Sequence, residues 1–74
     1  MAKFDVGAET TGSVWKILVA VGERVVSQQP LFILESMKME IPVESPCEGN
    51  VLSILVSEGD SVNEGQVLAT VESA

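Results

Sequence analysis

An internal repeat constrains the fold of this chain more than any other feature. Residues 12–36 align without a gap onto residues 49–73, at a constant offset of 37, and 11 of the 25 aligned positions are identical. The identical pairs are Gly12/Gly49, Val14/Val51, Ile17/Ile54, Leu18/Leu55, Val19/Val56, Gly22/Gly59, Val25/Val62, Gln29/Gln66, Leu31/Leu68, Glu35/Glu72 and Ser36/Ser73. At 74 residues the chain is one small domain, so the repeat predicts two similar halves related by a pseudo-two-fold axis.

Each half of the repeat carries the signals of strands and turns. The candidate strands are apolar, largely β-branched runs over residues 14–19, 31–34, 51–56 and 67–71. Turns are predicted at Gly22 and Gly59, and prolines at positions 30, 42 and 46 interrupt any long helix. We therefore predict an all-β fold, a flattened barrel or sandwich of two small sheets packed face to face, with strands exchanged between them.

Composition removes several classes of function. The net charge is −7 and the four basic residues are scattered along the chain, so nucleic-acid binding is not expected. The chain has no histidine and one cysteine, Cys47, which excludes an intrachain disulfide, ordinary zinc sites and histidine bases. We therefore expect a domain without catalytic residues or a metal site, rather than an independent enzyme.

The segment between the two halves contains the most informative residue, Lys38. One strand candidate ends just before Met37, and another, residues 39–44, follows Lys38 directly. Two strands joined by so few residues predict a tight hairpin with Lys38 at or near its tip. A lysine on such a turn is open to a modifying enzyme, although most lone lysines on hairpins only improve solubility. The residues alone leave both interpretations open.

Residues 35–39, Glu-Ser-Met-Lys-Met, resemble the biotin attachment motif Ala/Ser-Met-Lys-Met of biotin-dependent carboxylases, decarboxylases and transcarboxylases. The resemblance extends over nearly the whole chain. Residues 22–25 and 59–62 are similar to the two Gly-Asp-x-Val turns of the family, and residues 46–51 to its Pro-x-x-Gly-x-Val entry to the second half. On these motifs, residues 1–74 are identified as a member of the biotinyl/lipoyl attachment domain family.

The resemblance implies a flattened eight-stranded barrel with quasi-two-fold symmetry and biotin held in amide linkage on Lys38. In such carriers a biotin carboxylase loads a carboxyl group onto biotin at the expense of ATP, and a carboxyltransferase removes it. The carrier itself raises the local concentration of biotin at both sites. The implied partners are a biotin protein ligase, a biotin carboxylase and a carboxyltransferase, and we expect the isolated domain to be monomeric.

Location follows from what the chain lacks. No apolar run approaches the roughly 20 residues of a membrane-spanning helix, and residues 1–5 lack the apolar stretch of a signal peptide. We expect no membrane association and a cytoplasmic location, or a mitochondrial one for a domain excised from a eukaryotic carboxylase.

The chain departs from the family pattern at two places away from Lys38. Gln28 stands where the second half has Gly65 and where many relatives have glycine, which leaves the shape of that turn open. Residues 9–12, Glu-Thr-Thr-Gly, replace the frequent Ala-Pro-x-x-Gly. No segment is inserted between Trp15 and Gly22, where carriers of the bacterial acetyl-CoA carboxylase type have a protruding thumb, so the chain resembles the thumbless carriers.

Residues near the hairpin have more than one interpretation. The resemblance implies that Met37 and Met39 take part in recognition by the ligase and in placing biotin, whereas flexible methionines also suit a role in capping the hairpin core. Cys47 is expected to be a semi-buried turn residue, and Trp15 a core or rim aromatic rather than a stacking surface for biotin. Three glutamates form either an acidic collar for partners or a solvated strand face: Glu35, Glu40 and Glu44.

Two other functions compete. A lipoyl carrier shares the fold, but its usual Asp-Lys-Ala site does not match Met37-Lys38-Met39, and a protein that accepts both biotin and lipoate also fits the chain length. A purely structural β-domain would carry no modification. The offset of 37 maps Lys38 onto Met1 and onto the position after Ala74, so a pseudo-two-fold axis predicts Lys38 at the opposite end of the molecule from both termini.

Overall fold

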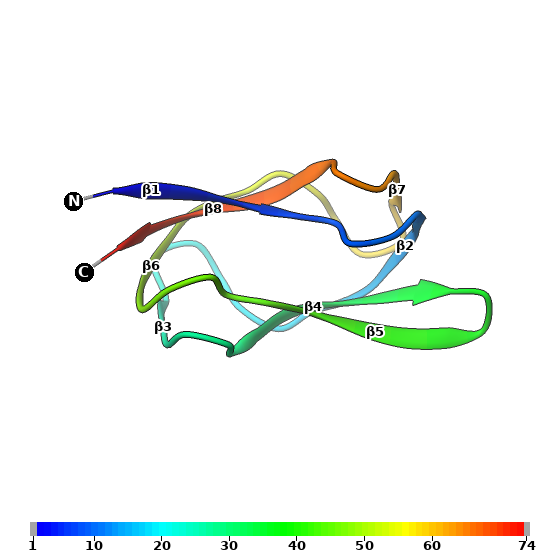
Figure 1. Cartoon of the computed structure of the whole chain (residues 1–74), viewed down its shortest axis with the longest axis horizontal. Helices are drawn as coiled ribbons and strands as arrows, with labels where there is room; N and C mark the ends of the chain where they lie inside the picture. The colour runs from blue at the N-terminus through cyan, green and yellow to red at the C-terminus, as the bar shows by residue number, and fades with distance from the viewer. Residues whose placement is uncertain (1, 74) are drawn as a thin grey trace.

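The computed structural model describes residues 2–73, which form eight β-strands in two four-stranded antiparallel sheets (Figure 1). The strands are β1 (Lys3–Gly7), β2 (Gly12–Ile17), β3 (Arg24–Val25), β4 (Pro30–Ser36), β5 (Met39–Glu44), β6 (Gly49–Ile54), β7 (Ser61–Val62) and β8 (Val67–Ser73). The strand order is β1-β8-β6-β3 in one sheet and β5-β4-β2-β7 in the other. The predicted all-β architecture of two facing sheets is confirmed. Within residues 2–73 no helix is long and apolar enough to cross a membrane.

The two halves of the repeat are equivalent in the structure and exchange strands. In the pairing of β2 with β7, Ser13 lies opposite Ser61, and in the pairing of β3 with β6, Arg24 lies opposite Asn50. Adding 37 to Arg24 gives Ser61, and subtracting 37 from Asn50 gives Ser13. Each half therefore contributes one short strand to the sheet of the other half, β3 from the first half and β7 from the second. A two-fold axis produces this relation.

The crossover turns have the same backbone conformation in both halves. Gly22 and Gly59 have φ angles of 90° and 93°, in the left-handed region that costs other residues about 1–2 kcal/mol. Their N–H groups donate hydrogen bonds to the other half, from Gly22 to the carbonyl of Val51 at 2.7 Å and from Gly59 to that of Val14 at 2.6 Å. The glycines thus allow the chain to leave one sheet and to form hydrogen bonds with the other half.

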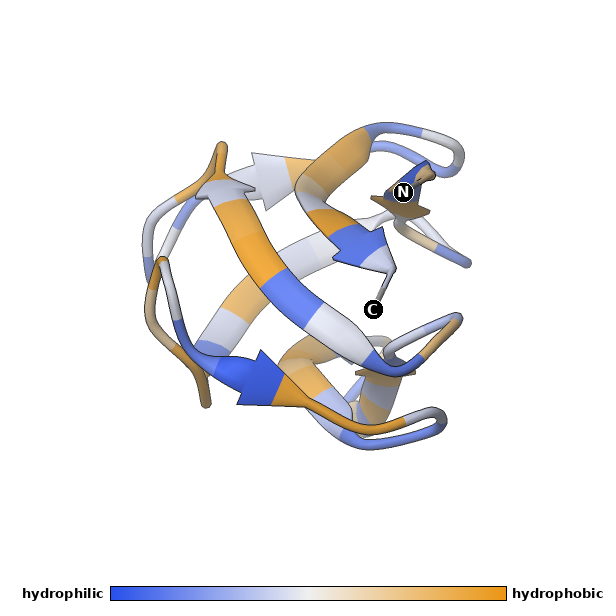
Figure 2. Ribbon diagram, turned by 90° about the vertical axis from the view of Figure 1, so that its left-hand side faces the viewer, coloured by the Kyte–Doolittle hydropathy of each residue, from blue (hydrophilic) through white to orange (hydrophobic). Residues whose placement is uncertain are grey.

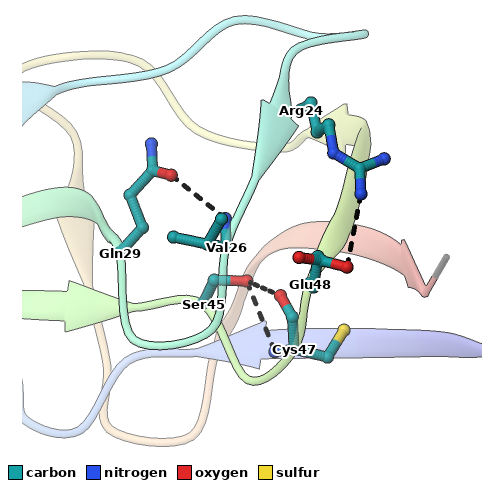
Figure 3. Close-up of polar contacts among 6 residues, drawn as sticks. All are labelled: Arg24, Val26, Gln29, Ser45, Cys47 and Glu48. Carbon is teal, nitrogen blue, oxygen red and sulfur yellow. Dashed lines mark hydrogen bonds and ion pairs between the residues drawn. The ribbon is translucent and has the colours of Figure 1, made fainter.

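The turn at Gln28 has the same shape as its counterpart at Gly65, so the departure from glycine leaves the backbone unchanged. The φ angles are 69° and 87°. Gln28 N–H donates to the carbonyl of Ser45 at 2.9 Å, and Gly65 N–H donates to that of Ala8 at 2.8 Å. The side-chain oxygen of Gln29 closes this turn by accepting a bond of 3.1 Å from a backbone N–H three residues earlier (Figure 3).

The core is a single cluster of aliphatic side chains around one phenylalanine, Phe32. In the end-on view of Figure 2, hydrophobic and hydrophilic residues alternate along much of the strands, as expected when one face is turned inward. At the register shifts of β4 and β8, two consecutive residues are buried, Leu31 with Phe32 and Leu68 with Ala69. The buried hydrophobic residues are Val6, Ala8, Val14, Val19, Val25, Leu31, Phe32, Leu34, Val43, Val51, Val56, Val62, Leu68, Ala69 and Val71. Cys47 is half-buried against this core, as predicted, and its carbonyl accepts a 2.7 Å bond from the hydroxyl of the buried Ser45 (Figure 3).

The molecule is elongated, 36 × 17 × 17 Å, and its two ends differ (Figure 1). The turn between β4 and β5 forms one end, whereas the start of β1 and the end of β8 lie together at the other. Met1 and Ala74, onto or beside which the repeat maps Lys38, lie outside the described residues. The prediction that Lys38 and the chain ends occupy opposite ends is confirmed for the described strands.

Candidate functional site

Lys38 lies on the two-residue turn that joins β4 to β5. Ser36 pairs with Met39 across the strands, and the two residues between them have positive φ angles, 52° for Met37 and 65° for Lys38. Two left-handed central residues define a type I′ turn, whose twist matches that of the flanking strands. Lys38 is exposed, so the predicted hairpin tip is confirmed.

This turn is unusual because neither central residue is glycine, asparagine or aspartate. A left-handed conformation costs an ordinary side chain about 1–2 kcal/mol, so Met37 and Lys38 both occupy a disfavoured conformation. Residues in disfavoured backbone conformations are concentrated at functional sites. The turn therefore presents Met37 and Lys38 at the cost of some stability.

The methionines beside Lys38 do not pack into the core. Met37 is 92% exposed and Met39 is 62% exposed. The interpretation that one of them caps the hairpin core is wrong, because both side chains are exposed and the core at this end is closed by the buried Leu34, which pairs with the half-buried Ile41. The two methionines instead flank the lysine as an exposed, flexible apolar surface.

The base of the hairpin is tied to the loop between β1 and β2. The hydroxyl of Ser36 donates a hydrogen bond of 2.8 Å to the carbonyl of Thr11. The hydroxyl of Thr11 in turn accepts a bond of 3.2 Å from the backbone N–H of Glu64, in the turn between β7 and β8. These bonds hold the hairpin against the body of the domain two residues before Lys38. Sequence reasoning missed Thr11, because no local pattern relates it to the hairpin.

The charges near the hairpin are mostly negative and unpaired. Residues 2–73 contain one ion pair, between Arg24 and Glu48 at 3.3 Å, near the end that holds the chain termini (Figures 1 and 3). Within that range no carboxylate is ion-paired with Lys38. Glu35 and Glu40 lie directly opposite each other on β4 and β5, and both are exposed. The amine of Lys38 is thus free to approach another molecule.

The arrangement suits covalent attachment of an acyl group. An exposed amine on a turn fixed by two paired strands can enter the active site of a modifying enzyme without unfolding the core. Among residues 2–73 we find neither a pocket nor a cluster of side chains that could hold a metal ion. The site is therefore a projecting tip rather than a cleft, and a group linked to Lys38 would extend away from the body of the domain.

Comparison with known proteins agrees with this geometry. The sequence model of a family described as biotin-requiring enzymes matches residues 4–71. The chain is 41% identical over 69 residues to the pyruvate carboxylase of Staphylococcus aureus, an alignment that covers 93% of this chain and 6% of the carboxylase. It is 44% identical over 63 residues to the biotin/lipoyl attachment protein of Bacillus subtilis, covering 85% of this chain and 86% of that protein.

A solved structure shows the same fold. The urea carboxylase of Kluyveromyces lactis superimposes with a TM-score of 0.91 at 33% sequence identity. The match covers 97% of this chain and 6% of the urea carboxylase. The chain therefore spans a small part of the large carboxylases that it resembles, and most of the small attachment protein.

Proposed function

Because the chain belongs to the family of biotin-requiring enzymes, we propose that it is a biotin carrier that holds biotin on Lys38 and moves a carboxyl group between a biotin carboxylase and a carboxyltransferase. The observation that carries the proposal is the position of Lys38, exposed between two exposed methionines at the tip of a strained hairpin. The motif at residues 37–39 and the family match support biotin as the attached group.

Attachment requires only that the ligase reach the amine. A ligase first activates the carboxyl group of biotin with ATP. Nζ of Lys38 then attacks the carboxyl carbon, the bond from that carbon to the ATP-derived leaving group breaks, and an amide bond is formed. The ammonium form must first lose a proton, since only the neutral amine is a nucleophile. The amide is uncharged, so the formal net charge of −7 becomes −8.

The elongated shape supports a carrier role. A tether at the end that holds β1 and β8 would leave the opposite end, with Lys38, free to move between two enzyme sites. When bound, biotin supplies the atom that accepts and releases the carboxyl group. The domain supplies proximity, because tethering raises the local concentration of biotin at each site.

The proposal includes partners, an absence of catalysis and a location. A ligase, a biotin carboxylase and a carboxyltransferase are the expected partners of a monomeric domain. The domain itself is expected to show no carboxylation activity with ATP and bicarbonate. We place it in the cytoplasm, or in mitochondria if it belongs to a eukaryotic carboxylase; a streptavidin blot of cell fractions would test this.

Intact mass spectrometry of the domain coexpressed with a biotin ligase tests the attachment. We expect the mass of a single biotinyl group, mapped by peptide analysis to Lys38, and turnover of the loaded domain only when a carboxylase is added. Biotin found on Lys3 or Lys16 would contradict the proposal, as would carboxylation by the domain alone.

The similarity to the Bacillus subtilis attachment protein favours one second candidate, a carrier of both biotin and lipoate. The same mass measurement, on domain produced with a lipoate ligase and lipoate, distinguishes the two. A lipoyl group on Lys38 would support dual use, whereas an unmodified mass would restrict the site to biotin.

A further inference from the structure

The outer face of the sheet that carries the hairpin has an apolar row across three strands. Pro42 on β5 pairs with Ile33 on β4, and Ile33 pairs with Lys16 on β2, next to the bulged residue Trp15. The neighbouring position on β2, Val14, is buried in the core, so this row faces outward. We call Trp15, Ile33 and Pro42 the apolar row.

The apolar row is accessible to solvent. Trp15 is 46% exposed, Pro42 is exposed and Ile33 is half-buried between them. The ammonium group of Lys16 lies 5.6 Å from the centre of the Trp15 ring and lies over one side of it, as a cation–π contact allows. The indole is therefore a rim residue on the outside of the sheet, held in place but available to a partner.

The pseudo-two-fold axis provides an internal comparison. The positions equivalent to Trp15, Ile33 and Pro42 on the other sheet are Leu52, Thr70 and Asp5. Asp5 pairs with Thr70, and Thr70 pairs with Ser53, in the same register as the apolar row. The same backbone thus accepts a mostly polar row, so the fold does not require the apolar one.

A pair of glutamates beside the apolar row shows the same asymmetry. Glu35 lies opposite Glu40, and like charges directly opposite each other destabilise a sheet. The equivalent positions on the other sheet are Glu72 and Lys3, which lie opposite each other with opposite charges. The sheet with the hairpin therefore carries a more apolar row than its counterpart, together with a pair of opposed like charges that its counterpart avoids.

We infer that the apolar row and the pair Glu35–Glu40 form the docking surface for the biotin carboxylase, an inference that rests on the proposed function. This enzyme binds ATP and bicarbonate whatever the final acceptor is, so we expect positive charge at the mouth of its active site. A basic rim around an apolar patch is complementary to this face, in which two glutamates border Trp15, Ile33 and Pro42.

The distance from the tip favours the carboxylase over the ligase. Ile33 precedes the turn by four residues, or about 13 Å along a strand. A ligase must bring its active site to the bare lysine, so it binds the tip itself. An enzyme that acts on the far end of the longer biotinyl-lysine arm can hold the domain further back, on the body of the sheet.

The small size of the surface suits a carrier. A row of three side chains is smaller than the roughly 800 Å² per partner that stable complexes bury. Tethering raises the effective concentration of the domain, so weak contacts are sufficient for docking and still permit release. A larger apolar face would hold the carrier at one enzyme.

Steady-state kinetics of the biotin carboxylase of the same organism test the inference. KM and kcat are measured with the biotin-loaded domain as substrate, and with free biotin as the reference substrate that makes no docking contacts. The variant W15L/I33T/P42D places the side chains of the counterpart row on the outer face, so its fold is already represented in the molecule. We expect its KM as a loaded domain to rise roughly tenfold with an unchanged kcat, as expected when anchoring contacts are lost. Its loading by the ligase should be unchanged.

Two further variants sharpen the result. Leu52→Ser removes the exposed apolar residue of the counterpart row, so we expect no change in KM. The double variant E35Q/E40Q should raise KM at low ionic strength and lose this effect at high salt, because screening removes the attraction between the acidic pair and the basic rim.

Failure of the docking surface and failure of the carrier function give different results in these experiments. An unchanged KM for W15L/I33T/P42D, an equal rise for Leu52→Ser, or an equal defect with the ligase would overturn the docking surface while the carrier function stands. A domain that is never loaded, or that is loaded but never carboxylated, would overturn both.

Discussion

The two ends of this molecule have almost the same backbone and different chemistry. At one end β4 and β5 are joined by Met37 and Lys38, and at the other the equivalent strands β8 and β1 end without a connection. The pairing of β4 with β5 is repeated by that of β8 with β1, residue for residue over most of its length. The difference between the ends is therefore not needed to form the sheets.

This comparison separates stability from function within one small chain. Features that both halves share, such as the glycine turns and the buried aliphatic positions, hold the fold together. Several features found in one half only lie at or near the hairpin, and they include a strained turn, exposed methionines and a pair of opposed glutamates. Substitutions in one half, with the equivalent position of the other half as a control, therefore test stability and function separately.

The largest effect is expected from Lys38→Arg. This variant should lose biotinylation completely, because a guanidinium group is not acylated, while its thermal unfolding midpoint stays the same, since the side chain is exposed. Lys3→Arg at the opposite end is the matched control and should be loaded normally. Streptavidin blotting with thermal denaturation measures both. Residual label on Lys38→Arg would show that another amine accepts biotin.

The next effect is a loss of stability at the glycines that start β2 and β6. A Cβ at Gly49 would overlap the carbonyl oxygen of Glu72, and a Cβ at Gly12 would overlap that of Glu35. We expect Gly49→Ala to cost about 3 kcal/mol and Gly12→Ala somewhat less, because overpacking forces the backbone apart. Total stability for 74 residues is only roughly 4–11 kcal/mol, so urea unfolding should resolve both.

These two glycines differ in what else they disturb. Gly12 lies against Glu35 and Ser36, next to the hairpin, whereas Gly49 lies at the end with the chain termini. Gly12→Ala should therefore also slow biotinylation of the folded protein, and Gly49→Ala should not. Equal loading of both folded variants would show that the hairpin position does not depend on its base.

A smaller effect is expected at the paired turns Gln28 and Gly65. Both residues have a left-handed backbone conformation, and a Cβ at Gly65 would have no atom within 4 Å. Glycine and glutamine at these positions therefore differ only in backbone strain and in the conformational entropy of the unfolded chain. Gln28→Gly and Gly65→Gln should change stability by similar amounts of opposite sign, each about 1 kcal/mol, with glycine the more stable. Chemical denaturation of the two single variants measures this. Effects of the same sign would show that the turns are not equivalent.

The smallest effect concerns the charge pair beside the hairpin. Glu40→Lys gives β4 and β5 the opposed charges that β8 and β1 already have at Glu72 and Lys3. We expect a gain of roughly 0.2–1 kcal/mol at low ionic strength, which diminishes as salt screens the exposed charges. Unfolding at two salt concentrations tests this, and a gain that is independent of salt would point to a cause other than charge.

Local sequence patterns predicted much of the fold. The turns at Gly22 and Gly59 and the strand over residues 39–44 occur where they were expected. The strands of residues 14–19 and 51–56 begin earlier than expected and end at residues 17 and 54, because the chain leaves its sheet there to cross to the other. The apolar pattern continues through the crossing, since Val19 and Val56 remain buried.

Other elements had no local signal. The two-residue strands β3 and β7 exist only because the other half offers β6 and β2 as partners, and β1 has a weak strand pattern that its pairing with β8 overrides. The exposure of Met37 and Met39 was also not predictable, because methionine suits a core as well as a surface.

The amino-acid sequence by itself determined the repeat, the strand-forming runs, the turn residues and the one lysine in the attachment motif, because these depend on spacing and on side-chain chemistry along the chain. Only the tertiary structure decided which face of a strand meets the core and which residues meet across the two-fold axis. The bulge between Val14 and Lys16 leaves both Trp15 and Lys16 exposed and returns Ile17 to the core, and Ser36 reaches Thr11 across 25 positions in sequence. Both contacts arise because β2 pairs with β4, a strand distant in sequence, and no local pattern encodes them.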